Sequence, residues 1–418
     1  MEGLLRRQRQ VLRRPRLAGR RRQDGGDRQG RGLRRRPPAA EPGPLSTPVT
    51  GGAVSGRLPD FPWDRLTQYA EKARAHADGI VDLSIGTPVD PTPRVAIEAL
   101  CAAADAPGYP MTIGVPELRQ AVVDWLANTH GVIGLGLDQV LPLVGSKEFI
   151  ASLAVHLGIG PGDVIGYPAL AYPTYEVGAA LAGARAVATD SLTAFGPETP
   201  KLLWLNSPSN PTGRVLPKEH LRKVVEWCRE RGVLLVSDEC YVDCVWEGEA
   251  YSVLHPDVCG GSADGILVVH SLSKRSNLAG YRCGFVAGDR AVIAELLSVR
   301  KNLGLMMPGP QQRAMAAVLD DAAHVAEQHA RYRVRRQKLR TALEAAGYTI
   351  EHSEASLYLW TTKGPDGPDS WQMLDELAGH GILVAPGAFY GAAGSHHVRV
   401  AFTATDERVD AAVARLSG

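Results

Sequence analysis

Residues 269–284 read Val269-His-Ser-Leu-Ser-Lys-Arg-Ser-Asn-Leu-Ala-Gly-Tyr-Arg-Cys-Gly284. The apolar run 266–269 predicts a short buried strand that leads into two serines and Lys274. An amine at the end of a buried strand can lose water and its proton, and it can then form a Schiff base with an aldehyde. The serine hydroxyls and Arg282, eight residues after the lysine, are short donors and a bidentate cation, which together suit a phosphate.

An aldehyde and a phosphate on one small molecule describe pyridoxal 5'-phosphate (PLP). The stretch therefore predicts a PLP site, with Ser271 and Arg282 on the phosphate and Lys274 on the aldehyde. The alternative is an ordinary junction between a strand and a loop, with an exposed lysine and arginine. The rest of the chain must decide between the two.

Length and composition set the broad class of the protein. A chain of 418 residues is long enough for two or three domains, and it contains no apolar run of membrane-spanning length. The six cysteines are scattered, without a Cys-x-x-Cys motif. We therefore expect a cytoplasmic protein in a reducing compartment, with no metal site and no membrane partner.

The first residues differ sharply from the rest in charge. Residues 1–36 contain fourteen arginines and three acids, a net charge of +11, so the remaining residues carry −10. A nucleic-acid-binding arm or a targeting peptide are the functional alternatives, but the segment has no aromatic residue and no serine before Ser46. We predict a disordered leader over residues 1–56, or sequence upstream of the true start, and no nucleic-acid partner.

From residue 140 onward, apolar strands alternate with helices. Such a pattern predicts an α/β fold with a mainly parallel sheet that helices cover on both faces. Ligands of these sheets bind at the carboxyl ends of the strands, where four polar residues fall: Ser146, Asn210, Asp238 and Lys274. No Gly-x-Gly-x-x-Gly follows a strand, so a nicotinamide site is not predicted.

The last hundred residues predict a smaller α+β domain. Helical spacing covers residues 308–319 and 325–346, and strand-like runs cover 356–361, 382–385 and 397–402, with Arg399 on the last. The predicted organisation is a segment 57–90 that packs with the small domain, a large PLP-binding domain 91–304 and the small domain 305–418.

With these stretches in hand, residues 58–416 resemble the fold-type I PLP enzymes, and among them the class I/II aminotransferases. The motifs that carry the resemblance are specific only together, in this order and at this spacing. They are Tyr109 with Gly114, Asn210-Pro-Thr-Gly213, Asp238-Glu-x-Tyr241, Ser271-x-Ser-Lys274 followed by Arg282, and Arg399 near the end.

The resemblance implies catalytic and cofactor-binding roles. Lys274 would hold PLP covalently and then move a proton between substrate and cofactor. Asp238 would keep the pyridine nitrogen protonated, although a solvated acid at a strand end is the alternative. Tyr241 and Asn210 would bind the ring hydroxyl, and Tyr172 would stack on the ring.

The resemblance also implies how phosphate and substrate are held. Ser146, the Lys147 backbone, Ser271 and Arg282 would bind the phosphate, and Tyr109 would reach the phosphate of a neighbouring subunit, which implies a homodimer with shared active sites. Arg399 would bind the substrate α-carboxylate, with Asn210 as a further substrate-binding residue and Gly86 permitting close approach. Arg275 departs from the family pattern and is left open, as a distal-carboxylate ligand or a solvated residue.

Three further stretches, residues 78–91, 205–216 and 382–391, resemble N-succinyldiaminopimelate aminotransferases. That resemblance implies amino transfer from glutamate to N-succinyl-2-amino-6-oxopimelate in lysine and diaminopimelate biosynthesis, with small amino and keto acids as the partners. The alternatives are an aminotransferase for aspartate or an aromatic acid, a PLP-dependent lyase, and a regulator that uses the PLP fold to bind nucleic acid.

Overall fold

The computed structural model describes residues 54–417. Most of the predicted leader, residues 1–53, lies outside the described residues. Within the described part, no helix is both long and apolar enough to cross a bilayer.

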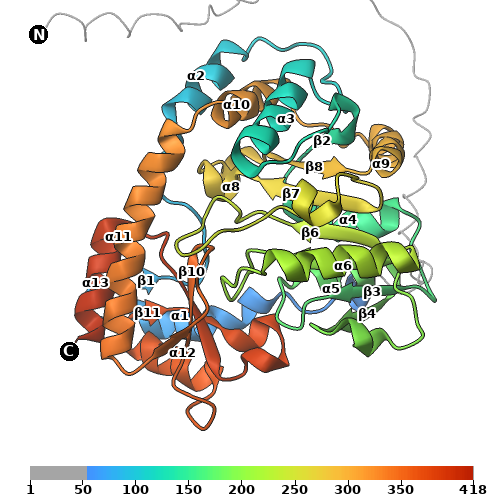
Figure 1. The fold of residues 1–418 in the computed structure, drawn as a ribbon. Helices are drawn as coiled ribbons and strands as arrows, with labels where there is room; N and C mark the ends of the chain where they lie inside the picture. The colour runs from blue at the N-terminus through green and yellow to red at the C-terminus, as the bar shows by residue number, and fades with distance from the viewer. Residues whose placement is uncertain (1–53, 418) are drawn as a thin grey trace, which may run out of the picture. The chain divides into compact units, whose positions relative to one another are not determined.

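A seven-stranded sheet forms the larger part of the fold (Figure 1). All its strands are parallel except β8, which runs antiparallel between β2 and β7. In spatial order the strands are β2 (Val140–Leu143), β8 (Gly284–Gly288), β7 (Ile266–Ser271), β6 (Leu234–Asp238), β5 (Leu202–Asn206), β3 (Val164–Tyr167) and β4 (Arg185–Ala188).

Helices cover both faces of this sheet, because successive residues of the central strands point to opposite sides. On β6, Leu235 belongs to a core cluster that includes residues of α3 (Pro116–His130), α6 (Lys218–Arg231) and α10 (Gly309–Leu319). The next residue, Val236, belongs to a second group of core residues. That second group contains α4 (Ser146–His156), α5 (Thr174–Ala182) and α9 (Arg290–Leu303). The predicted α/β architecture is confirmed.

The helices on the sheet carry regular start and stop signals. In α3 the apolar residues recur at three- and four-residue spacing and face the core: Leu118, Ala121, Val122, Trp125 and Leu126. Pro116 occupies the first turn, where its missing N–H costs no hydrogen bond. The helix ends at Gly131, whose φ of 66° is the left-handed conformation of a helix terminus.

A second region contains a smaller antiparallel sheet. Its strands are ordered β12 (Ala385–Pro386), β13 (His397–Ala401), β10 (Tyr358–Thr362) and β9 (Thr349–Glu351). The N-terminal strand β1 (Val81–Asp82) pairs in parallel with β11 (Ile382–Leu383), and α1 (Thr67–Arg74) packs on α12 (Ser370–Gly379). Segments at opposite ends of the chain therefore share one core, centred on the fully buried Trp360.

One long helix, α11 (Ala323–Ala345), extends from the neighbourhood of α10 to that of α13 (Asp406–Leu416) (Figure 1). Before it, α10 packs on α2 (Arg94–Ala102) and α3, in the core of the large sheet. The domain boundaries at 90/91 and 304/305 stay predictions.

The remaining helices are α7 (Pro256–Cys259), α8 (Leu272–Arg275), η1 (Val54–Arg57), η2 (Pro62–Leu66), η3 (Leu137–Gln139), η4 (Leu192–Phe195), η5 (Ala279–Tyr281), η6 (Gly387–Tyr390) and η7 (Ala392–Gly394).

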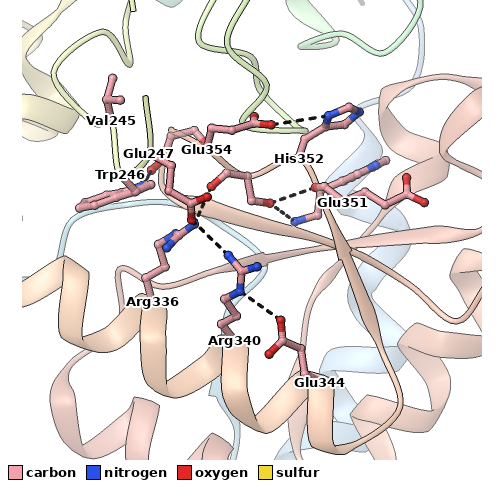
Figure 2. A network of polar contacts seen from close by, with 12 residues as sticks. Val245, Trp246, Glu247, Arg336, Arg340, Glu344, Glu351, His352 and Glu354 are labelled. Atoms are coloured by element: carbon pink, nitrogen blue, oxygen red, sulfur yellow. Dashed lines mark hydrogen bonds and ion pairs between the residues drawn. The ribbon is translucent and has the colours of Figure 1, made fainter. Parts of the chain in front are cut away.

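A polar network joins the two sheets where residues 245–247 meet residues 351–356 (Figure 2). Val245 and Ala355 form an isolated β-bridge, and the Trp246 and Glu247 amides donate to the Glu354 carbonyl at 2.8 and 3.0 Å. Glu247 also accepts from Arg336 of α11 at 2.6 Å. This junction fixes the approach to β10, the strand that carries Tyr358 into the site described next.

Candidate active site

A cavity of about 640 Å³ opens at the carboxyl ends of the parallel strands. It draws its walls from both sheets and from the N-terminal segment. Eleven of the twelve residues singled out in the sequence line it: Gly86, Ser146, Lys147, Tyr172, Asn210, Asp238, Tyr241, Ser271, Lys274, Arg282 and Arg399. The twelfth, Tyr109, does not; it lies in the loop between α2 and α3 and is 97% exposed.

Lys274 follows β7 on the single turn of α8. That turn is fixed by Ser271, whose hydroxyl accepts a hydrogen bond from the Ser273 amide at 3.2 Å. The Lys274 ammonium donates to the Gly86 carbonyl, which comes from the loop after β1. The amine is thus directed toward a loop that also lines the cavity.

Asp238 ends β6 and is deeply buried. One carboxylate oxygen accepts from the Tyr175 hydroxyl at 2.8 Å and the other from the Cys240 amide at 3.1 Å. Burial raises the pKa of Asp238, while these two hydrogen bonds oppose the shift. Among residues 54–417 Asp238 forms no ion pair, so a protonated ring nitrogen in the cavity would supply its missing positive partner.

Arg399 lies on β13 and is only 2% exposed. It donates to the Asn210 side-chain oxygen at 2.8 Å and to the Ser84 carbonyl at 2.7 Å, while its Nε has no partner in the described part of the chain. No described carboxylate pairs with it. A buried guanidinium without a counter-ion beside a cavity is a site for an anionic group, and its planar fork suits a carboxylate.

Tyr358, on β10, is a site residue that the sequence analysis missed. Its hydroxyl lies 2.9 Å from that of Tyr241, and the Arg399 guanidinium lies 3.9 Å above its ring. Burial alone would raise the pKa of Tyr358, but the charges of Arg399 and Lys274 and the bond to Tyr241 lower it. A side chain at Gly86 would collide with this ring, which explains the glycine there.

The anion-binding end of the cavity combines α4 with Arg282. The Arg282 guanidinium packs directly on Gly145, whose φ of 88° favours glycine, and Ser146 begins α4. Free amides at the start of α4, the hydroxyls of Ser146 and Ser271, and the Arg282 cation are the donors that a phosphate group needs.

Tyr172 also lines the cavity, next to the start of α5. Burial raises its pKa to about 12, so its hydroxyl stays protonated at neutral pH. Its ring packs edge-on against Tyr175 at 6.0 Å. The ring of Tyr172 therefore stays available to a flat ligand as an uncharged surface.

Arg275, left open by the sequence, does not line the cavity. It is 7% exposed, pairs with Asp243 at 2.9 Å and donates to the Val318 carbonyl at 2.7 Å. It is therefore neither solvated nor a substrate ligand in the cavity of its own chain, since it ties the end of α8 to Asp243 and to α10.

The mouth of the cavity is apolar and aromatic, which no sequence motif indicated. Residues 58–63 of the N-terminal segment line it together with Ile85, and Phe61 and Ile85 are about half exposed. The apolar lining of the cavity also includes the buried Ile150 and Phe389. Trp63 packs on Phe389 at 5.5 Å, and the Lys147 ammonium lies 5.3 Å from the Phe61 ring.

These features fit PLP. The cavity combines a lysine amine, a buried carboxylate without a counter-ion, a tyrosine ring at the wall and a phosphate-sized set of donors. Lys274, Asp238, Tyr172 and the Arg282 cluster are the residues that would hold the aldehyde, the ring nitrogen, the ring face and the phosphate.

Comparison with known proteins agrees with this chemistry. The family model "Aminotransferase class I and II" matches residues 78–416. A probable aminotransferase of Mycobacterium tuberculosis, Rv1178, is 55% identical over 423 residues and covers all of both chains. The 4-dedimethylamino-4-oxo-anhydrotetracycline transaminase OxyQ of Streptomyces rimosus is 56% identical over 360 residues, covering 86% of this chain and 99% of its own.

Solved structures share the fold. A probable N-succinyldiaminopimelate aminotransferase from Thermus thermophilus is 30% identical with a TM-score of 0.76, over 85% of this chain and 99% of that one. The family match and the cavity together confirm the prediction of a PLP enzyme. This chain therefore belongs to the class I and II aminotransferases, which are fold-type I, PLP-dependent enzymes.

Proposed function

We propose that the chain transfers the amino group of glutamate to N-succinyl-2-amino-6-oxopimelate, in lysine and diaminopimelate biosynthesis. The Thermus relative supports this substrate, because its name carries the same activity. A cytoplasmic homodimer with shared active sites is part of the proposal. Five of the ten large apolar side chains that are exposed within residues 54–417 fall between residues 85 and 111, which supports a subunit contact there.

Four cavity residues, Lys274, Gly86, Asp238 and Arg399, have defined tasks in this proposal. PLP, when bound, supplies an electron sink for the carbanion that forms at the substrate α-carbon. Lys274 Nζ removes the proton from that carbon and then gives it to the cofactor. The Gly86 carbonyl orients the amine. Asp238 keeps a positive charge on the ring nitrogen. Arg399 binds the α-carboxylate of donor and acceptor alike.

The choice of substrate rests on one cation in the cavity that the α-carboxylate, the phosphate and the aldehyde leave without a task. Four lysines and arginines line the cavity, and three of them have tasks already: Lys274, Arg282 and Arg399. The fourth, Lys147, forms no ion pair with any described residue, and its ammonium faces the Phe61 ring near the mouth. A distal carboxylate of the acceptor would provide its counter-ion.

A second candidate is an acceptor with an aromatic or polycyclic body. The aromatic mouth formed by Phe61, Trp63 and Phe389 favours it. The high identity to OxyQ, a transaminase whose named substrate is an anhydrotetracycline, points the same way.

A panel of keto acids tests the two candidates. We expect kcat/KM to be highest for the succinylated substrate, and Lys147→Met to lower it by about 10-fold or more, since a charge-assisted bond contributes about 1.5–3 kcal/mol. The same variant should change kcat/KM for phenylpyruvate less than about twofold. Preference of the wild type for phenylpyruvate or a polycyclic ketone would overturn the succinyl substrate.

A further inference from the structure

Tyr175 occupies a position that the cavity itself does not explain. It lies near the start of α5, is fully buried and is absent from the cavity lining. Nevertheless its hydroxyl donates to Asp238 Oδ2 at 2.8 Å. The side chain therefore touches neither cofactor nor substrate, yet it contacts the carboxylate that faces the ring nitrogen.

The ring of Tyr175 is fixed by two aromatic neighbours. It stacks on Trp204 of β5 at a centroid distance of 5.0 Å and an interplanar angle of 24°. It meets the edge of Tyr172 at 6.0 Å and 86°. Through these contacts and its hydrogen bond, Tyr175 links the ring of Tyr172 in the cavity wall to the buried Asp238.

The electrostatics indicate that the proton of the Tyr175–Asp238 hydrogen bond stays on Tyr175. Burial, and then the negative charge of Asp238, raise the pKa of Tyr175 well above its usual value. The phenol is thus a neutral donor at neutral pH. The bond in turn lowers the pKa of Asp238, against the effect of burial.

We propose that Tyr175 is a positioning residue that holds Asp238 ionised and oriented, so that the carboxylate can retain a proton on the ring nitrogen of PLP. The inference rests on PLP-dependent amino transfer but not on the identity of the acceptor. Two contacts and one absence support it: the buried Tyr175–Asp238 bond, the Cys240 amide on the other oxygen, and the lack of a cation paired with Asp238 among the described residues.

Tyr175→Phe removes only the hydroxyl and keeps the ring packing. We expect kcat to fall by about 10-fold to 100-fold, from the range for a bond to a charged group. The affinity for PLP, measured by titrating the apo-protein, should fall in the same direction. Because loss of the donor raises the pKa of Asp238, the acid limb of the pH profile of kcat/KM, and of the cofactor absorbance, should move to higher pH.

Tyr348→Phe is the matched control, since Tyr348 is also buried and its hydroxyl has no partner among the described residues. It should change neither limb nor kcat. If the acid limbs of the pH profiles of Tyr175→Phe and Tyr348→Phe coincide, the proposal is wrong, even when the activity of Tyr175→Phe falls. Should the variant fail to fold, 3-fluorotyrosine at position 175, a stronger donor, must shift the limb to lower pH, and an unmoved limb overturns the proposal.

These readouts separate two failures. The pH profile and kcat are measured with the amino donor that the wild type accepts fastest. They therefore stay valid if the proposed amino acceptor is wrong. A wild-type protein that binds no PLP would instead refute the proposed function itself.

Discussion

Arg399 shows how a single residue can report on substrate chemistry. It is buried against the rings of Tyr358 and Tyr390, and its two hydrogen bonds go to neutral acceptors rather than to a carboxylate. Keeping such a charge in the protein interior is costly unless a ligand neutralises it during the reaction. Both half-reactions present an α-carboxylate, so both should depend on this side chain.

Arg399→Lys keeps the charge but loses the planar fork. We expect kcat/KM to fall by about 10-fold to 100-fold for the amino donor and by the same factor for the acceptor. The two half-reactions are followed separately by cofactor absorbance, with Arg185→Lys, an exposed arginine paired with Glu198, as the control. Loss confined to one substrate would contradict the shared α-carboxylate role.

At the scale of elements, the junction of residues 245–247 with residues 351–356 holds the two sheets in place relative to each other (Figure 2). Its loop carries three residues other than glycine at left-handed φ, namely His352 at 53°, Ser353 at 69° and Ser356 at 71°. Backbone amides of this loop donate to neighbouring carbonyls and stabilise this conformation: Ser353 to Thr212, Ala355 to Gly213 and Ser356 to Cys244. Through them the Asn210 loop, the Tyr241 loop and β10 are fixed relative to one another.

Glu247→Gln tests this junction, because Glu247 is the carboxylate partner of the buried Arg336. We expect the free energy of unfolding in urea to fall by about 1 kcal/mol, a small value because Glu247 is half exposed. Glu344→Gln, which removes only a pair within α11, should change it by less than about 0.5 kcal/mol. Equal losses in the two variants would contradict a special role for the junction.

The same comparison has a predicted pH dependence. The hydrogen bond from Arg336, the largest cause, lowers the pKa of Glu247. A carboxyl with a lowered folded pKa stabilises the protein above its ordinary pKa, and this stabilisation is lost as the pH falls through the folded value. Glu247→Gln and wild type should therefore converge in stability in acid.

The elements also show what could be predicted from sequence. Continuous apolar runs identified β2, β3, β5, β6, β7 and β8, because each is buried on both faces. The edge strand β4 was missed, since its half-exposed residues form no such run.

The site could be predicted only where residues follow strand ends. Ser146, Asn210, Asp238 and Lys274 follow parallel strands, whose carboxyl ends meet at one edge, and the structure brings them to one cavity. Tyr358 and Tyr175 were not predicted. The first depends on the antiparallel register that sets Trp360 opposite Arg399, and the second on the packing of α5 against β5 and β6. Neither register nor helix packing can be read from spacing.

At the scale of the whole molecule, the proposed dimer explains Tyr109. Its side chain is almost fully exposed and does not reach the cavity of its own chain. A large exposed aromatic residue beside Met111 is typical of a contact surface. If Tyr109 completes the phosphate site of a neighbouring subunit, two defective chains should complement each other.

We therefore predict that Lys274→Ala and Tyr109→Ala chains, each nearly inactive alone, regain activity when they are unfolded and refolded together. The mixed dimer has one site with both Lys274 and Tyr109 intact, so recovery should approach about a quarter of wild type. Light scattering should report twice the chain mass. Monomers in solution, or no recovery in the mixture, would contradict shared active sites.

The central claim is that the amine of Lys274 binds the cofactor covalently. The most direct measurement is borohydride reduction of the purified protein, followed by peptide mapping and by absorption spectra before and after adding glutamate. We predict a pyridoxyl group on Lys274 alone, and an absorption band that glutamate shifts in the unreduced protein. A colourless protein after growth with ample vitamin B6, unmodified at Lys274 after reduction, would contradict this account.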